Sequence, residues 1–481
     1  MLEMSDSRVI DRNAEAAGVT VSTLMENAGK CVADLIETKF GDRKHIVFVC
    51  GPGNNGGDGF VAAGILSRSR KTSVILMRGS TEAQQRPHLK ERLDRVSGLV
   101  GDASLLESPG QKRTLIVDCL LGSGISRPPS GEFRNIIQSI NEARTGGAAV
   151  VSVDVPSGFP FDEHVKPDVT ITFTDKKSGM NESNSGRIVI ADIGIPDRAL
   201  KYTGPGEMEL YPVPEKYSHK GNNGIVTVIG GGVFSGAAVF SSLAAYRTGA
   251  DLVYTFVPES SLLTVASFSP SIMAFPVEER KVSSEDISRI LLWAEKSGSA
   301  LIGPGTDASS HDFITEVIRR ISCPLVIDAG GIEAAGKNHA ILSGKDAVIT
   351  PHSMEFYKLT GALLEEDIES RKSTVMKWAS KLGVTILLKG AVDIISDGRR
   401  TRLNETGNAG MTVGGTGDVL AGIVAALMSK GLSGFDAARL GAYMNGCAGD
   451  VCFMKKSYGL VASDVIEAIP EVLISHLGVK R

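Results

Sequence analysis

Short runs of apolar residues alternate with helical segments along most of the chain. The runs are rich in Val and Ile and show little polar alternation, which is typical of strands buried on both faces of a sheet. In the first half they are residues 45–50, 72–77, 114–120, 148–155, 169–173 and 187–193. Helical segments, such as residues 5–18 and 60–71, lie before or between them. This alternation predicts an α/β fold with a mainly parallel sheet.

The pattern breaks at residues 201–224, which hold three Pro and four Gly and no periodic apolar face. Such a stretch is typical of a linker between domains. A second series of candidate strands follows, at residues 225–232, 251–258, 300–305, 324–331, 347–351, 384–390 and 393–397. We therefore predict two domains, at about 1–210 and 215–481.

Composition narrows the class of protein. The 481 residues are long enough for two or three domains, and 51 basic against 55 acidic residues leave no excess of positive charge for nucleic acid. Six cysteines without CxxC or zinc-finger spacing favour a reducing compartment. No apolar stretch is long enough to span a bilayer, and the polar start lacks a signal-peptide core. We expect a soluble cytoplasmic homo-oligomer that binds neither nucleic acid nor membrane.

Glycine is the outlier of the composition, at 55 of 481 residues, or about 11% against a typical value of about 7%. The first glycine-rich loop is CGPGNNGGDG at residues 50–59, between a strand and an apolar helix. Gly51, Gly53 and Gly56 satisfy GxGxxG, and the N–H groups of a helix start form a natural anion site.

The usual dinucleotide fingerprint includes an acid at the end of the second strand. This chain has Arg78 there, so the fingerprint is incomplete. The GxGxxG pattern alone fits either a tight structural turn or a binding loop. The amide and carboxylate side chains clustered in residues 54–58 favour the binding loop, since a packing turn has little use for them.

Two further strand ends carry acids that would reach the same edge of a parallel sheet. Asp118 lies in one strand, and Asp154 lies near the end of another, just before a Pro-Ser-Gly turn. Open α/β sheets bind ligands at the carboxyl ends of their strands. Asn55, Asp118 and Ser157 together offer hard oxygen ligands to a small cation, although either acid alone could merely cap a neighbouring loop.

These segments resemble the NAD(P)H-hydrate epimerase family over nearly all of residues 1–200. The motifs that carry the resemblance are LMENAG, GPGNNGGDGFVAA, VDCLLGSG, VDVPSG and VTITFTDKKSG. The resemblance implies a Rossmann-like, doubly wound domain that interconverts the two C6 epimers of hydrated NAD(P)H with a bound potassium ion. The implied substrate-binding residues are Asn54, Asn55, Gly56, Gly57, Asp58, Gly122, Ser123, Gly124, Ile125, Ser126, Arg127, Pro128 and Asp154.

The same resemblance implies roles for a cation site and an acid/base pair. Asn55, Asp118 and Ser157 are implied to bind potassium. Asp154 and Lys177, the lysine that matches the family's KxG segment, are the candidates for acid/base catalysis. The neighbouring Lys176 leaves the choice of lysine open, as does the possibility that Lys177 is a surface residue.

The second half holds a loop suited to phosphoryl transfer, NAGMTVGGTGD at residues 408–418, which leads into the apolar helix VLAGIVAALMSKG. Residues 414–417 present bare N–H groups at the start of that helix, where they stabilise negative charge on a phosphoryl group. Asp418 lies in the first turn, placed to accept a proton from an attacking hydroxyl. The structural alternative is an ordinary helix N-terminal acid beside a glycine turn.

Two lysine-containing segments are weaker candidates. GIEAAGKN at residues 331–338 is a near miss to the P-loop, because Asn338 stands where a Ser or Thr should bind magnesium. We therefore interpret it as a loop. Lys389, at the end of the strand 384–390, is better placed to meet a nucleotide phosphate, with a plain strand-ending lysine as the alternative.

GGTGD resembles the ribokinase-like superfamily, and the full set of motifs in the second half is similar to ADP/ATP-dependent NAD(P)H-hydrate dehydratases over about 215–475. The set is SHKGNNGIVTVIGGG, SGAAVFSSLAAYRTGADLV, IGPG, VIDA, TPHSMEF, LLKG and NAGMTVGGTGDVLAG. That family transfers phosphate from the nucleotide to the C6 hydroxyl and then expels it to regenerate NAD(P)H. The resemblance implies a ribokinase-like α/β domain.

The residues implied for this second reaction fall into three groups. Asp418 is the base, and His352 and Gly305 contact the hydrate. Glu355 is a candidate to organise Mg²⁺ through water, or else a solvated helix residue, and DAGG at residues 328–331 departs from the usual DADG, which puts a role for the second acid in doubt. The residues implied to contact the nucleotide are Lys389, Gly390, Ala391, Val392, Asp393 and Gly417.

Both domains in one chain make chemical sense, because hydration of NAD(P)H gives both epimers and a chiral pocket accepts one. We predict a bifunctional repair enzyme that epimerises R- and S-NADHX or NADPHX and dehydrates the S epimer with ADP or ATP and Mg²⁺. Nothing in the sequence decides between ADP and ATP, or between NADHX and NADPHX.

Two alternatives stay open. One is a vitamin or sugar kinase with a nucleotide-binding front domain, disfavoured by His352 and by KGNNG at residues 220–224. The other makes the first domain a non-enzymatic binding or assembly module, disfavoured by its intact polar motifs.

Overall fold

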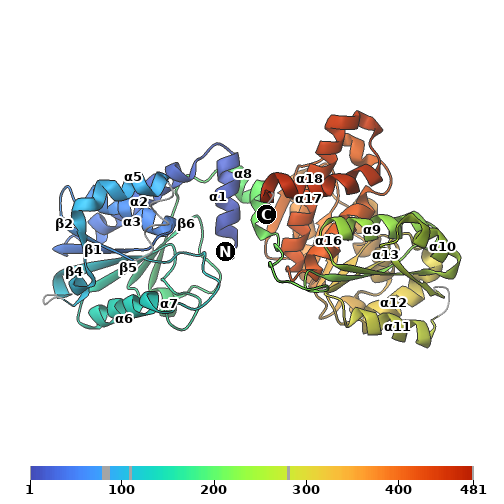
Figure 1. Cartoon of the computed structure of the whole chain (residues 1–481), viewed down its shortest axis with the longest axis horizontal. Helices are drawn as coiled ribbons and strands as arrows, with labels where there is room; N and C mark the ends of the chain where they lie inside the picture. Colours follow the sequence, from blue (N-terminus) through green and yellow to red (C-terminus); the bar gives the residue numbers. More distant parts are fainter. Residues whose placement is uncertain (1, 78–86, 108–110, 279–281, 479–481) are drawn as a thin grey trace. The chain divides into compact units, whose positions relative to one another are not determined.

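The computed structural model describes residues 2–77, 87–107, 111–278 and 282–478. Arg78, whose position left the dinucleotide fingerprint incomplete, lies outside the described residues. The chain forms two compact units, Met1–Leu200 and Lys201–Arg481, each built around one sheet (Figure 1).

The first unit has a sheet of seven parallel strands. They are β1 (His45–Cys50), β2 (Lys71–Leu76), β3 (Val100–Gly101), β4 (Thr114–Cys119), β5 (Ala149–Val153), β6 (Val169–Phe173) and β7 (Arg187–Ala191). Their order is β3-β2-β1-β4-β5-β6-β7. This is the Rossmann order, and its switch point lies between β1 and β4, which run in parallel register. The helices are α1 (Asp6–Ala16), α2 (Val21–Lys39), α3 (Asn54–Leu66), α5 (Pro87–Val96), α6 (Glu132–Thr145), α7 (Glu182–Ser185) and α8 (Asp197–Lys201).

Helices cover both faces of this sheet, with α2, α3 and α5 on one and α6 and α7 on the other (Figure 1). Successive side chains of β1 point to opposite faces. Ile46 and Phe48 join the apolar cluster formed with α2 and α3, whereas Val47 and Val49 join the cluster formed with α6. All four are fully buried, which explains the unbroken apolar runs in the sequence.

The second unit has a sheet of nine strands. They are β8 (Ile225–Ile229), β9 (Leu252–Pro258), β10 (Met273–Val277), β11 (Ser299–Ile302), β12 (Leu325–Ile327), β13 (Ala347–Ile349), β14 (Thr385–Leu388), β15 (Asp393–Ser396) and β16 (Thr401–Asn404). Their order is β10-β9-β8-β11-β12-β13-β14-β15-β16. The strands from β10 to β14 are parallel, and β15 and β16 complete the edge as an antiparallel pair.

Helices again form two layers. They are α9 (Ser235–Arg247), α10 (Glu259–Phe268), α11 (Ser284–Ala294), α12 (His311–Arg320), α13 (Gly330–Lys337), α14 (Ser353–Thr360), α15 (Ile368–Leu382), α16 (Thr416–Ser429), α17 (Gly434–Lys456) and α18 (Ala462–Leu477). One apolar cluster joins α9, α16, α17 and α18 to the sheet, and another joins α11 to α15 to its other face. Within the described part of the chain, no helix combines the length and the apolar character needed to cross a bilayer.

Two expectations for the second unit are wrong. Residues 331–338, interpreted as a loop, lie almost entirely in α13, because Ile332, Ala334 and Ala335 are fully buried in the core. Part of the segment predicted as a linker is also packed. Met208 and Tyr211 belong to the core of the second unit, and the Tyr211 hydroxyl donates a hydrogen bond to the Thr248 carbonyl at 3.0 Å.

The same segment carries a buried charge. The Glu207 carboxylate is fully buried, accepts a hydrogen bond from the Gly204 N–H at 2.7 Å, and lies 3.9 Å from the guanidinium of the equally buried Arg439. Arg439 also pairs with Asp436 at 2.9 Å. Residues 201–211 are therefore an integral part of the second unit.

This packing predicts that a fragment of residues 201–481 folds cooperatively, whereas one of residues 215–481 is much less stable. The shorter fragment exposes the core at Met208 and Tyr211 and removes Glu207 from buried Arg439. Loss of one partner of a buried ion pair alone costs about 3–5 kcal/mol. Urea denaturation followed by circular dichroism measures the difference. Equal midpoints would mean that the segment adds nothing to stability.

Candidate active sites

In the first unit, a cavity of about 440 Å³ lies at the switch point of the sheet, beside the loops that follow β1 and β4 and beside helices α1, α2 and α3. The substrate-binding residues predicted from the sequence that line it are Asn54, Asn55, Asp58, Gly122, Ser123, Gly124, Ile125 and Asp154. Lys177 also lines the cavity, and Lys176 does not. Ser126, Arg127 and Pro128 are exposed and lie outside the lining.

Gly56 and Gly57 do not line the cavity either, and close packing explains both residues. A Cβ atom on Gly56 would overlap the carbonyl oxygen of Gly51, and one on Gly57 would lie 2.5 Å from the Met25 sulfur. The two glycines therefore let α3 approach the preceding loop and α2, which brings the start of α3 to the cavity.

An ion pair between Asp154 and Lys177 lies at the centre of this site. The Lys177 Nζ is 2.7 Å from the Asp154 Oδ1, and it donates hydrogen bonds to the Thr172 hydroxyl and the Phe173 carbonyl. Burial raises the pKa of Asp154, but Lys177 and the Ser123 N–H outweigh burial and bring the pKa below its usual value. Asp154 is therefore ionised at neutral pH. Its backbone has φ +66°, a left-handed conformation that a non-glycine residue adopts under constraint.

The residues proposed for a cation lie beside the same loop. Asp118 is fully buried and accepts hydrogen bonds from the Ser152 hydroxyl at 2.7 Å and from the Ser157 N–H at 2.9 Å. Burial raises the pKa of Asp118 more than these bonds lower it. The Ser157 hydroxyl accepts a bond from the Leu121 N–H. Both polar atoms of the Asn55 amide are buried and have no hydrogen-bond partner among the described residues.

Sequence reasoning missed Asp11, which lines the cavity from α1. Burial, with a further contribution from the negative charge of Asp154, raises the pKa of Asp11 to about 6, although Lys177 opposes the shift. Burial also raises the pKa of Asp58 well above its usual value. The sequence signal for Asp11 was weak, because it is one of several polar residues beside the apolar stripe of α1.

In the second unit, the switch point lies between β8 and β11. Gly305, in the loop after β11, has φ +73°, and a Cβ atom there would overlap the Phe234 carbonyl oxygen. His352 caps the start of α14, where its Nδ1 accepts the N–H groups of Met354 and Glu355 at 3.1 and 3.3 Å. Glu355 accepts the His352 N–H in return at 2.8 Å. TPHSMEF thus forms a capping box that fixes both side chains.

Lys389 connects the carboxylates of this site. Its Nζ lies 3.0 Å from the Asp328 Oδ1 and 3.6 Å from the Glu355 Oε2. A Cβ atom on Gly417 would lie 3.4 Å from the same Nζ, so the lysine also faces the start of α16. Burial lowers the pKa of Lys389, but the charges of Asp328 and Glu355 outweigh burial and raise it overall. The lysine therefore stays cationic.

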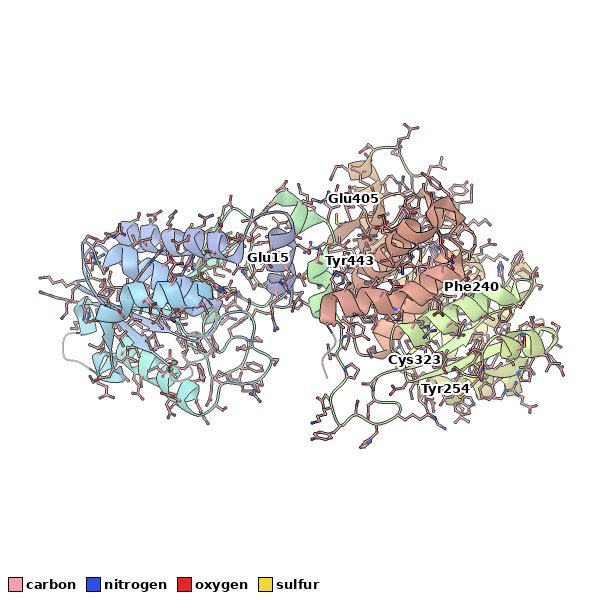
Figure 2. All side chains as sticks on the ribbon, turned by 45° about the horizontal axis from the view of Figure 1, so that its top comes forward. Glu15, Phe240, Tyr254, Cys323, Glu405 and Tyr443 are labelled. Atoms are coloured by element: carbon pink, nitrogen blue, oxygen red, sulfur yellow. The ribbon has the colours of Figure 1, made fainter. Side chains whose placement is uncertain are left out.

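Asp418 lies in the first turn of α16, as predicted. Burial and the negative charge of Asp328 raise its pKa to about 7, against an opposing effect of Lys389. Gly415 precedes the helix with φ +98°, and a Cβ atom there would lie 2.6 Å from the ring of Phe240 (labelled in Figure 2). Glycine is therefore required at this position, because the start of α16 packs directly against Phe240 of α9.

The predicted nucleotide segment, Lys389, Gly390, Ala391, Val392 and Asp393, is the connection between β14 and β15. Asp393 holds this turn, since its carboxylate accepts the Gly390 N–H at 2.9 Å and the Asn404 amide at 3.0 Å. Burial raises the pKa of Asp393 to about 6. Its side chain therefore shapes the turn that presents Lys389.

Asp328 is the second residue that sequence reasoning missed. The altered DAGG segment drew attention to position 330, yet it is Asp328 that pairs with Lys389 and accepts the Thr350 hydroxyl at 2.8 Å. A Cβ atom on Gly330 would overlap the Thr306 hydroxyl. An acid directly after a buried strand was the available signal, the same signal that singled out Asp154.

The KGNNG segment, used to disfavour the kinase alternative, lies elsewhere. It precedes β8, and Asp251, which precedes β9, accepts the N–H groups of Gly221 and Asn223 at 2.7 and 3.0 Å. The segment is therefore at the amino ends of these parallel strands, the opposite edge from Lys389 and Asp418, and it carries no weight in the choice of substrate.

Comparison with known proteins shows the family to which this chain belongs. A family model described as NAD(P)H-hydrate dehydratase matches residues 226–471, and one described as YjeF-related protein N-terminus matches residues 21–179. The bifunctional NAD(P)H-hydrate repair enzyme of Hyperthermus butylicus is 35% identical over 97% of this chain and 91% of that protein. The corresponding enzyme of Archaeoglobus fulgidus is 36% identical over 98% of this chain and 97% of its own length. The chain belongs to the bifunctional NAD(P)H-hydrate repair enzyme family.

A solved structure supports the fold of the second unit. A ribokinase-like superfamily protein from Enterococcus faecalis matches with a TM-score of 0.51 and 25% identity, over 57% of this chain and 96% of that chain. The predicted α/β fold class and the predicted family are thus confirmed. Neither the vitamin or sugar kinase nor the assembly module is needed to explain this repair enzyme.

The raised pKa of Asp418 predicts a pH-dependent stability. A carboxyl whose pKa is about 7 in the folded state and about 4 when unfolded contributes stability below pH 4 that is lost as pH rises through 7. Asp418→Asn should therefore raise the melting temperature relative to wild type at pH 8 and leave it nearly unchanged at pH 4. Thermal melts across this range test the idea, and parallel profiles would show that the charge costs nothing.

Proposed function

We propose that the two units of this repair enzyme carry separate reactions. The first unit interconverts the R and S epimers of NAD(P)HX, and the second dehydrates the S epimer with ADP or ATP as phosphoryl donor. The observation that carries the proposal is the position of Asp418. It lies in the first turn of α16, at a glycine-lined helix start, where the charges of the Lys389–Asp328 ion pair act on it. Family membership supports the same division, since separate models match the two units.

In the second unit, the C6 hydroxyl of the hydrate attacks the terminal phosphoryl group of the nucleotide. Asp418 accepts the hydroxyl proton, a role suited to a carboxyl whose pKa is about 7. The N–H groups at the start of α16 and the cationic Lys389 stabilise the charge on the phosphoryl oxygens. The C6–O bond then breaks with its electron pair, phosphate leaves, and loss of the C5 proton restores the double bond of NAD(P)H.

The residues of this site suit Mg²⁺, which is bound through carboxylates and nucleotide phosphates. Glu355 and Asp328 would supply the carboxylates, and both contact Lys389. Mg²⁺ would supply further positive charge to the phosphates. His352 and Gly305 are our candidates for contact with the nicotinamide part of the hydrate.

In the first unit, Asp154 and Lys177 are the proposed acid/base pair, and Asn55, Asp118 and Ser157 are the proposed ligands of a potassium ion. An all-oxygen donor set fits a hard monovalent cation. The unpartnered, buried amide of Asn55 supports the assignment, because a buried polar group without a hydrogen bond is costly. The ion would balance the buried charge of Asp118 and hold the loop of residues 120–122.

The cation assignment predicts the behaviour of Asp118→Ala. Epimerisation should weaken and lose its response to added potassium, because a charged ligand is gone. Dehydration of the S epimer in the other unit should be unaffected and provides the control. Rates measured in potassium and in sodium chloride test the assignment, and the same potassium dependence in wild type and variant would refute it.

The dehydration mechanism predicts a large loss for Asp418→Asn. A general base contributes about 10²–10⁴-fold to rate, so conversion of S-NADHX to NADH should fall by at least 100-fold. Nucleotide affinity should persist, since Asn can still occupy the helix start. NADH absorbance after mixing with NADHX epimers and ADP or ATP measures conversion, and epimer exchange in the same preparation reports folding. A loss of only a few-fold would leave Asp418 as a capping residue.

A further inference from the structure

Asp11 is a carboxyl in the first cavity that the assigned roles leave unused. It lines the cavity from α1, on the same helix face as Ser7 and Arg8. Asp154 and Lys177 line the same cavity. Whereas Asp154 contacts Lys177 at 2.7 Å, the Asp11 carboxyl makes no hydrogen bond to any other residue that the structure describes. It is therefore free to bond a ligand.

The charged groups around Asp11 come from several elements. Arg8 lies on α1, Asp58 on α3, Asp154 in the loop after β5, and Lys177 after β6. Lys177 is committed to Asp154, which is therefore ionised. Asp11 instead has a pKa of about 6, because burial and the negative charge of Asp154 outweigh the effect of Lys177. The cavity thus holds one carboxylate kept charged, Asp154, and two carboxyls whose pKa values burial raises, Asp11 and Asp58. Of these two, Asp11 is the one to which no role has been assigned.

Epimerisation at C6 needs both kinds of group. The C6 hydroxyl is attached beside the ring nitrogen N1, whose electron pair can expel it and form a C6–N1 iminium. Hydroxide is a poor leaving group, so an acid must protonate the oxygen as the C6–O bond breaks. Water then adds to the other face of C6 and gives one proton to a base. Enzymes separate the pKa values of paired carboxyls for such acid and base roles.

We propose that Asp11 is a catalytic residue of epimerisation, which donates the proton to the departing C6 hydroxyl, while Asp154 accepts the proton from the water that adds to the opposite face. This inference rests on the proposed function of the first unit and replaces Lys177 as the acid: Lys177 holds Asp154 ionised through their ion pair and transfers no proton itself. The C6–O bond breaks with its electrons on the protonated oxygen, and a new C6–O bond forms from water. One proton leaves Asp11 and one reaches Asp154, and in the reverse direction the roles exchange, so nothing is oxidised or consumed.

The full chain tests this in one reaction with mixed NADHX epimers, excess ADP or ATP, Mg²⁺ and K⁺. The S epimer should be consumed in a fast phase, and the R epimer in a slow phase limited by epimerisation. Asp11→Asn should slow the second phase by at least 100-fold, the range for loss of a general acid, and leave the first phase unchanged. Asp11→Glu should recover part of the rate. Glu15→Gln is the matched control, since Glu15 is an exposed acid on the same helix (labelled in Figure 2) that forms an ion pair with exposed Arg12 at 3.1 Å and does not line the cavity.

The pH profile separates catalysis from a structural role. In wild type, kcat/KM of the slow phase should fall as pH rises through about 6, because the acid must be protonated, and this step should vanish in Asp11→Asn. The affinity for NADHX and the melting temperature should stay close to wild type. A slow phase within a few-fold of wild type, or an unchanged pH step, would overturn the role of Asp11. If wild type consumed the R epimer no faster than it epimerises without enzyme, the proposed function itself would instead be overturned.

Discussion

In each unit a lysine of the site forms an ion pair that keeps neighbouring carboxylates charged. Lys177 contacts Asp154 in the first site, and Lys389 contacts Asp328 and Glu355 in the second. For the remaining carboxyls, Asp11 and Asp418, the lysine lowers the pKa less than burial and the neighbouring carboxylate raise it. Each site therefore contains both an ionised carboxylate and a carboxyl that can be protonated, which is the condition that acid/base chemistry requires.

Most of the fold could be predicted because most strands are buried on both faces. Val, Ile and Leu runs identify such strands without reference to neighbours, as β1 and β12 illustrate. The strands that escaped prediction lack that signal: β3 has two exposed residues, β10 contains Pro276 and is half-buried, and β16 is TRLN. The packed part of residues 201–224 escaped for a similar reason, since Met208 and Tyr211 enter a core made by helices that come much later in the chain.

The candidate sites were predicted where a motif concentrates polar residues at a strand or helix end. Asp118, Asp154 and Asp418 all belong to such motifs, and the structure brings them beside the expected loops. Asp11 stands apart from the clustered motifs, and Asp328 lies in a motif, VIDA, whose acid was not singled out. The surroundings of both residues depend on elements far away in the sequence. The choice between Lys176 and Lys177 likewise depended on side-chain direction after β6, which spacing alone does not determine.

The way residues 201–211 are anchored has a consequence for handling the protein. The most exposed stretch between the two motif-bearing halves is the turn around Val213 and Tyr217, which are 55% and 81% exposed. A protease that cleaves after lysine would cut there at Lys216 or Lys220. Residues 201–211 would nevertheless stay attached to the second unit through Tyr211 and Glu207. Such a nicked molecule would migrate as two bands on a denaturing gel while the upstream piece remained docked by non-covalent packing. New chain ends or an inserted tag are thus better tolerated in this turn than a few residues upstream.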